Sequence, residues 1–440
     1  MMVIRIFFVI SLLFISFNIL TSSRPLFDAE LEDGVESFHG FLELPSRDDR
    51  KPVEDATTIS ENSELKHDII VNRGPNHCHH CRPHGHRHHH RHRHRQHGKP
   101  GKRHHQPRKP PRRKAPVPAA PPPAAIQADI VVAQDGSGNF RTINDAVTSV
   151  GRLRNGGERF TIHVKAGTYT EYVDIPYDME NVTMIGDGIG KTILTGNKFV
   201  SSNVSTPDSR TFGVFGNGFV AQGITFRNTA GRQAGRAVAL MSLTNHSVFY
   251  RCSFEGYQDT LYINRGIQFF KECDIYGTVD MIFGDPTAIL QHCHIYLRHP
   301  QYNVLTIVAQ KRESPDSKTG IVIQNSTITT DGELSQMIEH GSTMRIYLGR
   351  PWGNYSRTVV INTFLENIDS EGWLGWDVNP DLVYYAEFGN SGPGSTTSGR
   401  VKWKGFHIID EHQVLNFTVG SFLQGDDWLP ATKVPYASGL

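Results

Sequence analysis

The chain has 440 residues, a length that allows two or three domains, and its 45 basic and 44 acidic residues leave a formal net charge of +1. That balance hides an uneven distribution, because residues 129–440 hold 25 Lys and Arg against 31 Asp and Glu. The N-terminal part and residues 129–440 therefore differ in composition and are considered separately. The net charge of the whole chain does not indicate what kind of partner the protein binds.

The first 23 residues are typical of a secretory signal peptide. Residues 1–5 form a short positive start, residues 6–20 a mostly apolar run, and residues 21–23 a cleavage site of small residues. A membrane anchor is the alternative, but the apolar run is short for a bilayer span and three polar residues interrupt it. Six Asn-X-Ser/Thr triplets agree with export. We therefore predict a secreted protein rather than a membrane protein.

The next two segments are predicted to be disordered, because neither can bury a core. Residues 24–71 are acidic, whereas residues 72–128 hold 14 Lys and Arg, many His and Pro, and no acidic residue. We predict that this basic tract is a solvated polycation that gains charge as its imidazoles protonate below about pH 6.5. It would adhere to an anionic polymer, and export argues against nucleic acid as that polymer.

One cluster inside the basic tract has a second interpretation. The run His77-Cys78-His79-His80-Cys81 brings thiolates and imidazoles together, which is an arrangement that can bind a metal ion. It lacks the second ligand pair of a zinc module, so the solvated polycation stays as the alternative. Cys78 and Cys81 can also pair with each other.

From Asp129 onward the chain consists of short β-rich runs separated by Gly, Asn and Asp, with Thr142 to Val150 as the main helix candidate. A phrase recurs after apolar stretches, and its clearest steps are 21 and 20 residues: Gly223-Ile-Thr-Phe, Cys252-Ser-Phe, Cys273-Asp-Ile, Cys293-His-Ile and Ser326-Thr-Ile. Unequal coils with a fixed short strand describe a parallel β-helix, whereas propeller blades repeat at about double that length. We therefore predict that residues 129–440 form an all-β solenoid.

Three cysteines occupy the same position in consecutive coils, namely Cys252, Cys273 and Cys293. Their side chains should form an inward stack, in which two neighbours can form a disulfide in an oxidising compartment. Cys273 with Cys293 is the preferred pair. The alternative is a plain core column of small apolar residues.

Asp259 and Asp280 stand 21 residues apart, each seven residues after a cysteine in a matching frame. If one repeat is one coil, these carboxylates lie about one strand spacing apart, roughly 4.8 Å. At an effective dielectric near 20 their repulsion is about 3 to 4 kcal/mol, so one acid should stay protonated beside an ionised neighbour. A neutral acid beside a carboxylate nucleophile is a usable catalytic pair. The alternative is that Asp merely recurs at a turn position.

Eight short strings stand out in the same region. They are Gly167-Thr-Tyr-Thr-Glu171, Gly256-Tyr-Gln-Asp-Thr-Leu261, Gly277-Thr-Val-Asp-Met-Ile-Phe-Gly284, Leu348-Gly-Arg-Pro-Trp352, Trp373-Leu-Gly-Trp376, Tyr384-Tyr-Ala-Glu387, Ser398-Gly-Arg-Val-Lys-Trp403 and Trp428-Leu-Pro430. Together they resemble the plant pectin methylesterases, or pectinesterases, over about Asp129 to Leu440. The first four follow the family's order and spacing, so the match is specific.

The resemblance implies a right-handed parallel β-helix that hydrolyses the methyl esters of galacturonan to methanol and free carboxylates, without a metal or an organic cofactor. On matching positions, Asp280 is the nucleophile and Asp259 is the proton donor that later activates water. Gln258 falls at the position that stabilises the oxyanion.

Three further positions follow from the same resemblance. Arg350 matches the arginine that orients the nucleophile, although an arginine near two aspartates can also be a plain salt bridge. Trp352 would present a flat apolar face to a sugar ring, whereas many tryptophans are only core residues. Thr206 falls at a substrate-contacting threonine. The Gly167 to Glu171 string is expected to be structural.

The chain departs from the family pattern at two positions. Arg236 stands where most members carry a glutamine that helps bind the oxyanion and substrate. Its guanidinium can donate the same hydrogen bond, but pairing with Asp259 would lower the pKa of that acid and remove the proton it must deliver. We therefore expect reduced but real esterase activity. Met281 replaces a phenylalanine, a swap of similar volume that should matter less.

The resemblance also bears on partners and on rival functions. We expect a monomer that acts on methylesterified pectin in the cell wall, lacking the helical inhibitor domain that relatives often carry, because residues 24–128 show no such helices. A lyase would need a calcium site, and no acidic cluster suited to calcium lies near the paired acids. A glycosidase also uses paired carboxylates. A non-catalytic pectin-binding wall protein stays open because of Arg236 and the basic tract.

Overall fold

The computed structural model describes residues 126–154 and 156–440. The predicted signal peptide, the acidic segment and nearly all of the basic tract, including the cluster His77 to Cys81, lie outside the described residues. What was inferred about them stays a prediction. No described helix is long and apolar enough to cross a membrane.

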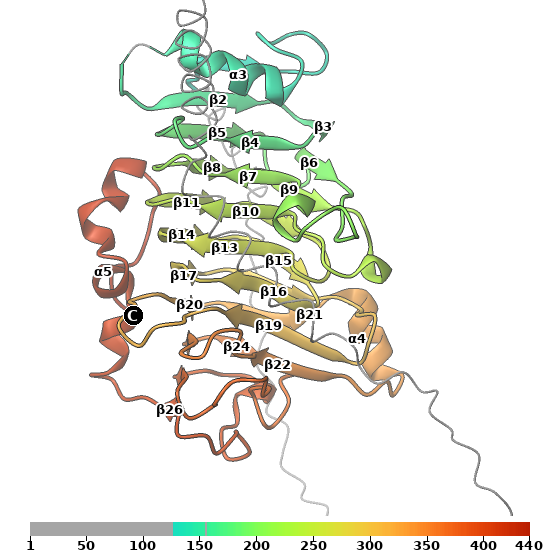
Figure 1. Cartoon of the computed structure of the whole chain (residues 1–440), viewed down its shortest axis with the longest axis vertical. Coiled ribbons are helices and arrows are strands. Elements are labelled where there is room, and N and C mark those ends of the chain that lie inside the picture. The colour runs from blue at the N-terminus through green and yellow to red at the C-terminus, as the bar shows by residue number, and fades with distance from the viewer. Residues whose placement is uncertain (1–125, 155) are drawn as a thin grey trace, which may run out of the picture. The chain divides into compact units, whose positions relative to one another are not determined.

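The described chain is a right-handed parallel β-helix, as predicted. The central coils each contribute one short strand to each of three sheets, and successive coils stack on one another (Figure 1). Every strand pair in the three sheets is parallel, for example β10 with β13 and β13 with β16. We name the sheets A, B and C, and they have 11, 8 and 7 strands.

Each sheet is a ladder of short strands stacked along the helix axis. In spatial order, sheet A contains β1 (Ile130–Val132), β2 (Phe160–Val164), β5 (Val182–Gly186), β8 (Val220–Gln222), β11 (Ser247–Tyr250), β14 (Ile267–Lys271), β17 (Thr287–Gln291), β20 (Gly320–Gln324), β23 (Arg357–Ile361), β25 (Tyr384–Phe388) and β26 (Phe406–Ile408). Sheet B contains β24 (Phe364–Leu365), β21 (Thr327–Thr330), β18 (His294–Leu297), β15 (Asp274–Gly277), β12 (Ser253–Glu255), β9 (Thr225–Asn228), β6 (Thr192–Gly196) and β3 (Gly167–Thr170). Sheet C contains β22 (Arg345–Gly349), β19 (Val304–Gln310), β16 (Val279–Gly284), β13 (Leu261–Arg265), β10 (Leu240–Leu243), β7 (Phe212–Val214) and β4 (Val173–Ile175).

Helices are few and short. The α-helices are α3 (Ile143–Leu153), α4 (Gly332–Glu339) and α5 (Val419–Phe422), and the 3-10 helices are η1 (Pro207–Ser209), η2 (Arg232–Ala234), η3 (Pro393–Ser395), η4 (Val414–Phe417), η5 (Gly425–Asp427) and η6 (Leu429–Thr432). α3 is the helix predicted from Thr142, whose side chain caps it by accepting from the Asp145 N–H. Glu171 also caps it, accepting from the N–H groups of Ile143 and Asn144 at 3.0 Å each. The structural role expected for the Gly167 to Glu171 string therefore has a physical basis.

The corner between sheets A and B repeats one backbone device. In five consecutive coils a residue in the left-handed region turns the chain at this corner: Arg251 (φ 50), Glu272 (φ 53), His292 (φ 56), Asn325 (φ 51) and Asn362 (φ 48). The residue after each of these is buried, so small side chains form an inward column. The residues of this column are the first residues of the recurring sequence motif described above.

The column does not contain the expected Cys273–Cys293 disulfide. Cys252, Cys273 and Cys293 are all free and buried. The Sγ of Cys273 donates to the carbonyl oxygen of Phe249 at 3.2 Å, and burial, with the neighbouring Cys293, raises the pKa of Cys273 well above its usual value. These thiols behave as small apolar core residues, which was the alternative interpretation.

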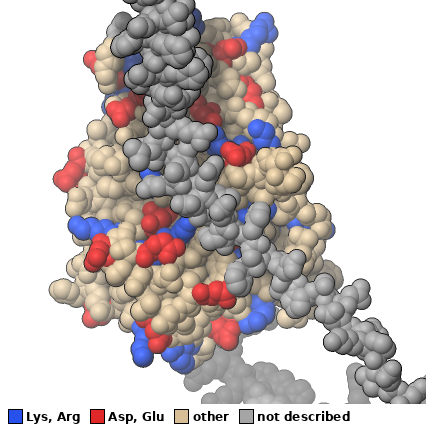
Figure 2. Space-filling view, in the orientation of Figure 1, with Lys and Arg blue, Asp and Glu red and all other residues tan. Residues whose placement is uncertain are grey.

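Charge is not concentrated on the face shown in Figure 2. Acidic and basic side chains are interspersed over the part of that face that the described residues leave visible. The distribution of charge on that face therefore does not indicate a binding surface for a charged partner.

A fully buried ion pair fixes the C-terminal coils. Arg400 donates to Glu387 through Nε (2.7 Å) and Nη2 (3.2 Å), and the side chains are 1% and 2% exposed. Arg400 also donates to the carbonyl oxygen of Gly394 at 2.7 Å, and Trp373 Nε1 donates to Glu387 at 3.3 Å. Three of the short strings singled out in the sequence thus meet at one carboxylate.

We expect Glu387→Gln to lower the free energy of unfolding by about 3 to 5 kcal/mol, because it leaves the Arg400 guanidinium buried without its counter-charge. Denaturant unfolding measures this loss. Glu371→Gln is the matched control, since it breaks the exposed pair with Arg345 (2.9 Å) and should cost less than about 1 kcal/mol. Equal losses in the two variants would contradict the role assigned to the buried pair.

Candidate active site

Asp259 and Asp280 occupy equivalent places in consecutive coils. Leu261 pairs with Ile282 across β13 and β16, so the positions two residues earlier also correspond. The backbone N–H of Asp259 donates to the carbonyl oxygen of Val279 at 3.0 Å, directly before Asp280. The two residues are 3% and 4% exposed. The 21-residue repeat therefore brings two buried carboxyl groups together, as the sequence indicated.

Both acids stand on a strained backbone. Asp259 has φ 63 and Asp280 has φ 49, in the left-handed region that residues other than glycine rarely adopt. The register between β16 and β19 also shifts between Val279 and Ile282, so Asp280 lies in a bulge. Bulges re-aim a side chain, and such strain gathers at functional sites.

Asp280 is held by two partners from later coils. Arg350 donates to it in a bidentate manner, Nε to Oδ1 at 2.8 Å and Nη2 to Oδ2 at 2.5 Å. The Thr306 hydroxyl donates to Oδ1 at 2.7 Å and accepts from the Asp280 N–H at 3.0 Å. The carboxylate therefore has a fixed orientation.

Arg350 is itself held against an aromatic ring. Its guanidinium carbon lies 3.8 Å from the centre of the Trp376 ring. The loop before Trp376 is tied to β22, because Leu348 N–H donates to the Gly372 carbonyl (2.8 Å) and Leu374 N–H donates to the Gly349 carbonyl (3.0 Å). Burial works to lower the pKa of Arg350, but the charge of Asp280 outweighs it and the pKa is raised.

Asp259 has the opposite character from its neighbour. Burial raises its pKa well above the usual value, and the charge of Asp280 raises that pKa further. Arg236, Arg350 and a hydrogen bond from Gln258 act in the other direction without cancelling the rise. The site thus pairs an acid that retains its proton with a carboxylate held by a guanidinium.

Gln258 and Arg236 lie side by side beside Asp259. They form a parallel bridge, and the N–H of Ala237 donates to the Gln258 carbonyl at 3.1 Å. The two side chains predicted to bind an oxyanion therefore come from neighbouring coils. Met281 is fully buried in the core, so the second departure from the family pattern lies on the inner side of the strand.

An aromatic surface adjoins the acids on the outer face of sheet C. Tyr262 and Phe283 stack with ring centres 4.4 Å apart, and Trp352 lies 6.0 Å from Phe283. The Lys311 ammonium lies 4.6 Å from the centre of the Trp352 ring. Trp352 is partly buried and packs against this cluster, so its contact with a sugar ring stays a prediction.

Thr206 lies farther along the same side of the molecule, at the start of η1. Its carbonyl accepts from the Ser209 hydroxyl (2.7 Å), and that hydroxyl accepts from the Val238 N–H (3.1 Å). Val238 precedes β10 as Asp259 precedes β13. Thr206 is therefore tied to the coil next to the acids.

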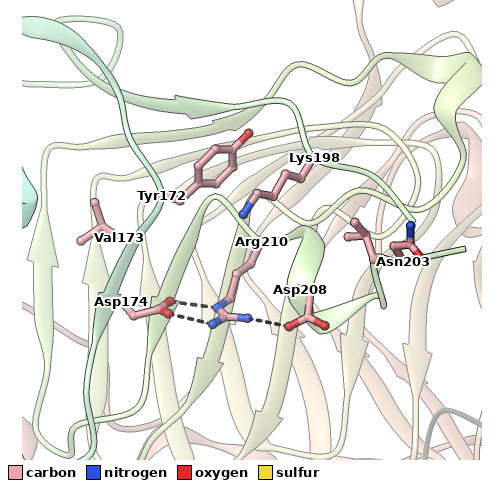
Figure 3. A pocket seen from close by; sticks show the side chains of 8 residues that line it. Tyr172, Val173, Asp174, Lys198, Asn203, Asp208 and Arg210 are labelled. Carbon is pink, nitrogen blue, oxygen red and sulfur yellow. Dashed lines mark hydrogen bonds and ion pairs between the residues drawn. The ribbon is translucent and has the colours of Figure 1, made fainter. Parts of the chain in front are cut away.

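A cavity of about 360 Å³ lies beside this loop, where β4 and β7 meet (Figure 3). Arg210 lies between Asp174, which accepts from it at 2.9 and 2.7 Å, and Asp208 at 3.6 Å. The Lys198 ammonium lies 4.1 Å from the centre of the Tyr172 ring. Strand pairing places Arg210 in the row of Asp259 and Asp280, so the cavity is roughly 10 to 14 Å from them along the helix axis.

Two residues of the site escaped sequence reasoning. Thr306 is 26 residues after Asp280, and the longer coil hides its equivalence to the regular repeat. Trp376 was visible only as part of a string, since nothing in its spacing places it over Arg350. Within residues 126–154 and 156–440, no group of three or more His, Cys, Asp or Glu side chains is placed to hold a metal ion.

The chain matches the family model described as Pectinesterase over residues 129–426. The chain belongs to the pectinesterase family. Pectinesterase 2 of Citrus sinensis is 50% identical over 318 residues, which cover 71% of this chain and 61% of that protein. Putative pectinesterase/pectinesterase inhibitor 38 of Arabidopsis thaliana is also 50% identical over 318 residues, covering 71% of this chain and 66% of the relative. The chain thus spans less than two thirds of the length of these curated pectinesterases.

Solved pectin methylesterases share the fold. The enzyme from carrot superposes with a TM-score of 0.69 at 42% identity, covering 72% of this chain and 99% of the carrot chain. The deglycosylated enzyme from Aspergillus niger gives a TM-score of 0.59 at 28% identity, covering 70% and 97%. Pectinesterase family membership therefore holds in sequence and in structure.

We expect Asp259→Asn to raise the free energy of unfolding and to flatten its dependence on pH. The folded protein binds a proton that the unfolded chain, with an Asp pKa near 3.9, has released. Stability from this group is complete below about pH 3.9 and is lost as pH rises through the raised folded pKa, by about 1.4 kcal/mol for each unit of pKa. Denaturant unfolding between about pH 4 and pH 8 measures it. A variant that is no more stable than the parent near neutrality would contradict the raised pKa.

Proposed function

We propose that this pectinesterase-family protein hydrolyses the methyl esters of galacturonan, releasing methanol and leaving free carboxylates. The single observation that carries the proposal is the pair of stacked acids, one clamped by Arg350 and one with a pKa raised by burial and by its neighbour. Acyl transfer by a carboxylate needs a charged nucleophile beside a neutral acid, and this geometry supplies both.

The reaction proceeds through an acyl-enzyme. An Asp280 oxygen attacks the ester carbonyl carbon, and the electron pair of the C=O bond moves to the oxygen, which receives hydrogen bonds from Gln258 and Arg236. As the pair returns, the bond to methoxide breaks and Asp259 gives its proton to the departing oxygen, so methanol leaves. Asp259, now ionised, takes a proton from water, and the hydroxide formed attacks the anhydride to restore Asp280 and release the carboxylic acid.

A polymer lying along the helix axis would meet the other predicted residues in turn. Trp352 borders the acids, and the loop of Thr206 lies on the same side of the β-helix. A related pectin methylesterase, 26% identical with a TM-score of 0.56, was solved in complex with a hexasaccharide. That agrees with a site that takes several sugar units.

The remaining parts of the proposal concern the setting. We place the protein in the cell wall as a secreted monomer that needs no cofactor, with the basic tract of residues 72–128 adhering to anionic wall polymer. The family assignment and the expected signal peptide support this setting.

A catalytically weak pectin-binding wall protein is the second candidate. Arg236 favours it, because its charge opposes the raised pKa of Asp259 and so works against proton delivery. Turnover separates the two candidates, since a binding protein releases no methanol.

We expect Asp280→Asn to reduce methanol release from methylesterified pectin by at least about a thousandfold, because the amide is a poor nucleophile. Asp274→Asn is the matched control, an acid of the neighbouring strand β15 that pairs with His294 rather than with the site. It should keep turnover within a few-fold of the parent. Comparable methanol release from the Asp280 variant would sink the proposed chemistry, and no release from the parent protein would favour the binding candidate.

We expect Arg236→Gln to raise turnover and to shift the alkaline limb of the pH–rate profile to higher pH. Removing the guanidinium removes an interaction that lowers the pKa of Asp259, so that acid keeps its proton to higher pH. Methanol release across pH measures both effects. Arg232→Gln is the control of equal charge change, because Arg232 pairs with Glu333 instead. An unchanged or lower turnover in the Arg236 variant would contradict this account.

A further inference from the structure

A second cavity lies on a different face of the β-helix from the acids. Its volume is about 470 Å³, and it forms where β23 and β25 of sheet A meet the C-terminal segment that contains η4 and α5. That segment packs on the outer side of sheet A, with Val414, Phe417 and Val419 against Val359 and its neighbours. In Figure 1, α5 lies beside sheet A. The cavity is therefore a built feature of the folded chain and not part of the catalytic row on sheet C.

Two cations line this cavity, and none of its lining residues is acidic. Arg357 begins β23 and Lys318 precedes β20, while Arg312 lies behind Arg357. Among the described residues, none of these three side chains lies within ion-pair distance of a carboxylate. The cations instead meet backbone oxygens: Arg357 donates to the Lys318 carbonyl at 3.2 Å, and Arg312 to the Ser317 carbonyl at 2.8 Å.

The charge of Arg357 is therefore incompletely compensated. Burial and then the neighbouring Arg312 lower the pKa of Arg357 to about 10. Asp285 and Tyr384 act in the opposite direction but do not restore the pKa. A partly buried cation beside a second one is costly unless an anion joins them. The open side of the cavity is where such an anion fits.

The other walls favour a sugar over a simple ion. Tyr384 and Phe417 stack with ring centres 5.5 Å apart, and both face the cavity together with Phe422. The side chains of Gln413 and Gln424 form part of the polar rim. Aromatic faces suit the C–H surface of a pyranose, amides suit its hydroxyl groups, and the guanidinium suits a carboxylate.

We propose that this cavity binds a carboxylate-bearing sugar unit of a polyuronate, separately from the catalytic cleft. Arg357 and Lys318 hold the carboxylate, and the ring lies against Tyr384 and Phe422. The binding is independent of turnover. With the proposed function, the free carboxylates that the cleft produces are the groups that the cavity takes, so the site would retain the protein on de-esterified polymer.

Isothermal titration calorimetry with trigalacturonate, at physiological salt, tests the proposal on the full chain produced without N-glycans. The parent background carries Asp280→Asn and Trp352→Ala, which weaken sugar binding at the catalytic acids. We expect Lys318→Gln and Arg357→Gln each to weaken binding by at least about tenfold. Lys318 is exposed, so its variant keeps the fold. Lys191→Gln is the matched control, an exposed lysine at the far end of the solenoid, and should leave affinity unchanged.

Two results would overturn the site. One is equal affinity for trigalacturonate in the parent, the Lys318 variant and the Arg357 variant. The other is equal binding of an uncharged galactose trimer, which would remove the role of the cations. In the otherwise unmodified chain, Lys318→Gln should leave methanol release from a soluble ester unchanged, so failure of the cavity and failure of the esterase are distinguished. The basic tract is present in every variant and cannot produce the difference between them.

Discussion

The bidentate contact between Arg350 and Asp280 is the interaction on which the chemistry of this molecule depends. A carboxylate that is 4% exposed would be costly to hold without a counter-charge, and the guanidinium supplies that charge in a fixed plane. The same contact makes the two acids unequal, because only Asp280 is paired with the guanidinium, while the charge of Asp280 raises the pKa of Asp259. The contact with Arg350 therefore fixes the orientation of Asp280, and the charge held there raises the pKa of Asp259.

That clamp depends in turn on coils remote from it in sequence. Trp376 lies against the Arg350 guanidinium, and the loop that carries it is anchored by Trp373, which stacks on Tyr385 with ring centres 4.2 Å apart. Trp373 also donates to Glu387, the buried partner of Arg400. The strings that contain Trp373, Glu387 and Arg400 thus support the site rather than take part in its chemistry.

The regular part of the solenoid could be predicted from the sequence, and the irregular part could not. Steps of 20 and 21 residues indicated the coil, the cysteine column and the pairing of Asp259 with Asp280, because equivalent positions in stacked parallel coils lie next to each other in space. Thr306 stayed hidden because its coil is longer. The prediction of a Cys273–Cys293 disulfide was wrong. Equivalent positions in adjacent coils bring two thiols near each other without requiring a bond, and here both remain buried free thiols.

Asp259 and Asp280 belong to a row of equivalent positions in successive coils, next to sheet C. In successive coils the same position is Arg210, Val238, Asp259 and Asp280. Arg210 is neutralised locally by Asp174, and the fully buried Val238 separates that pair from Asp259. Because each coil contacts mainly its neighbours, the Arg210–Asp174 pair and the two acids form separate local networks. The bulge at Asp280 and the raised pKa of Asp259 therefore fall on two neighbouring coils of the β-helix.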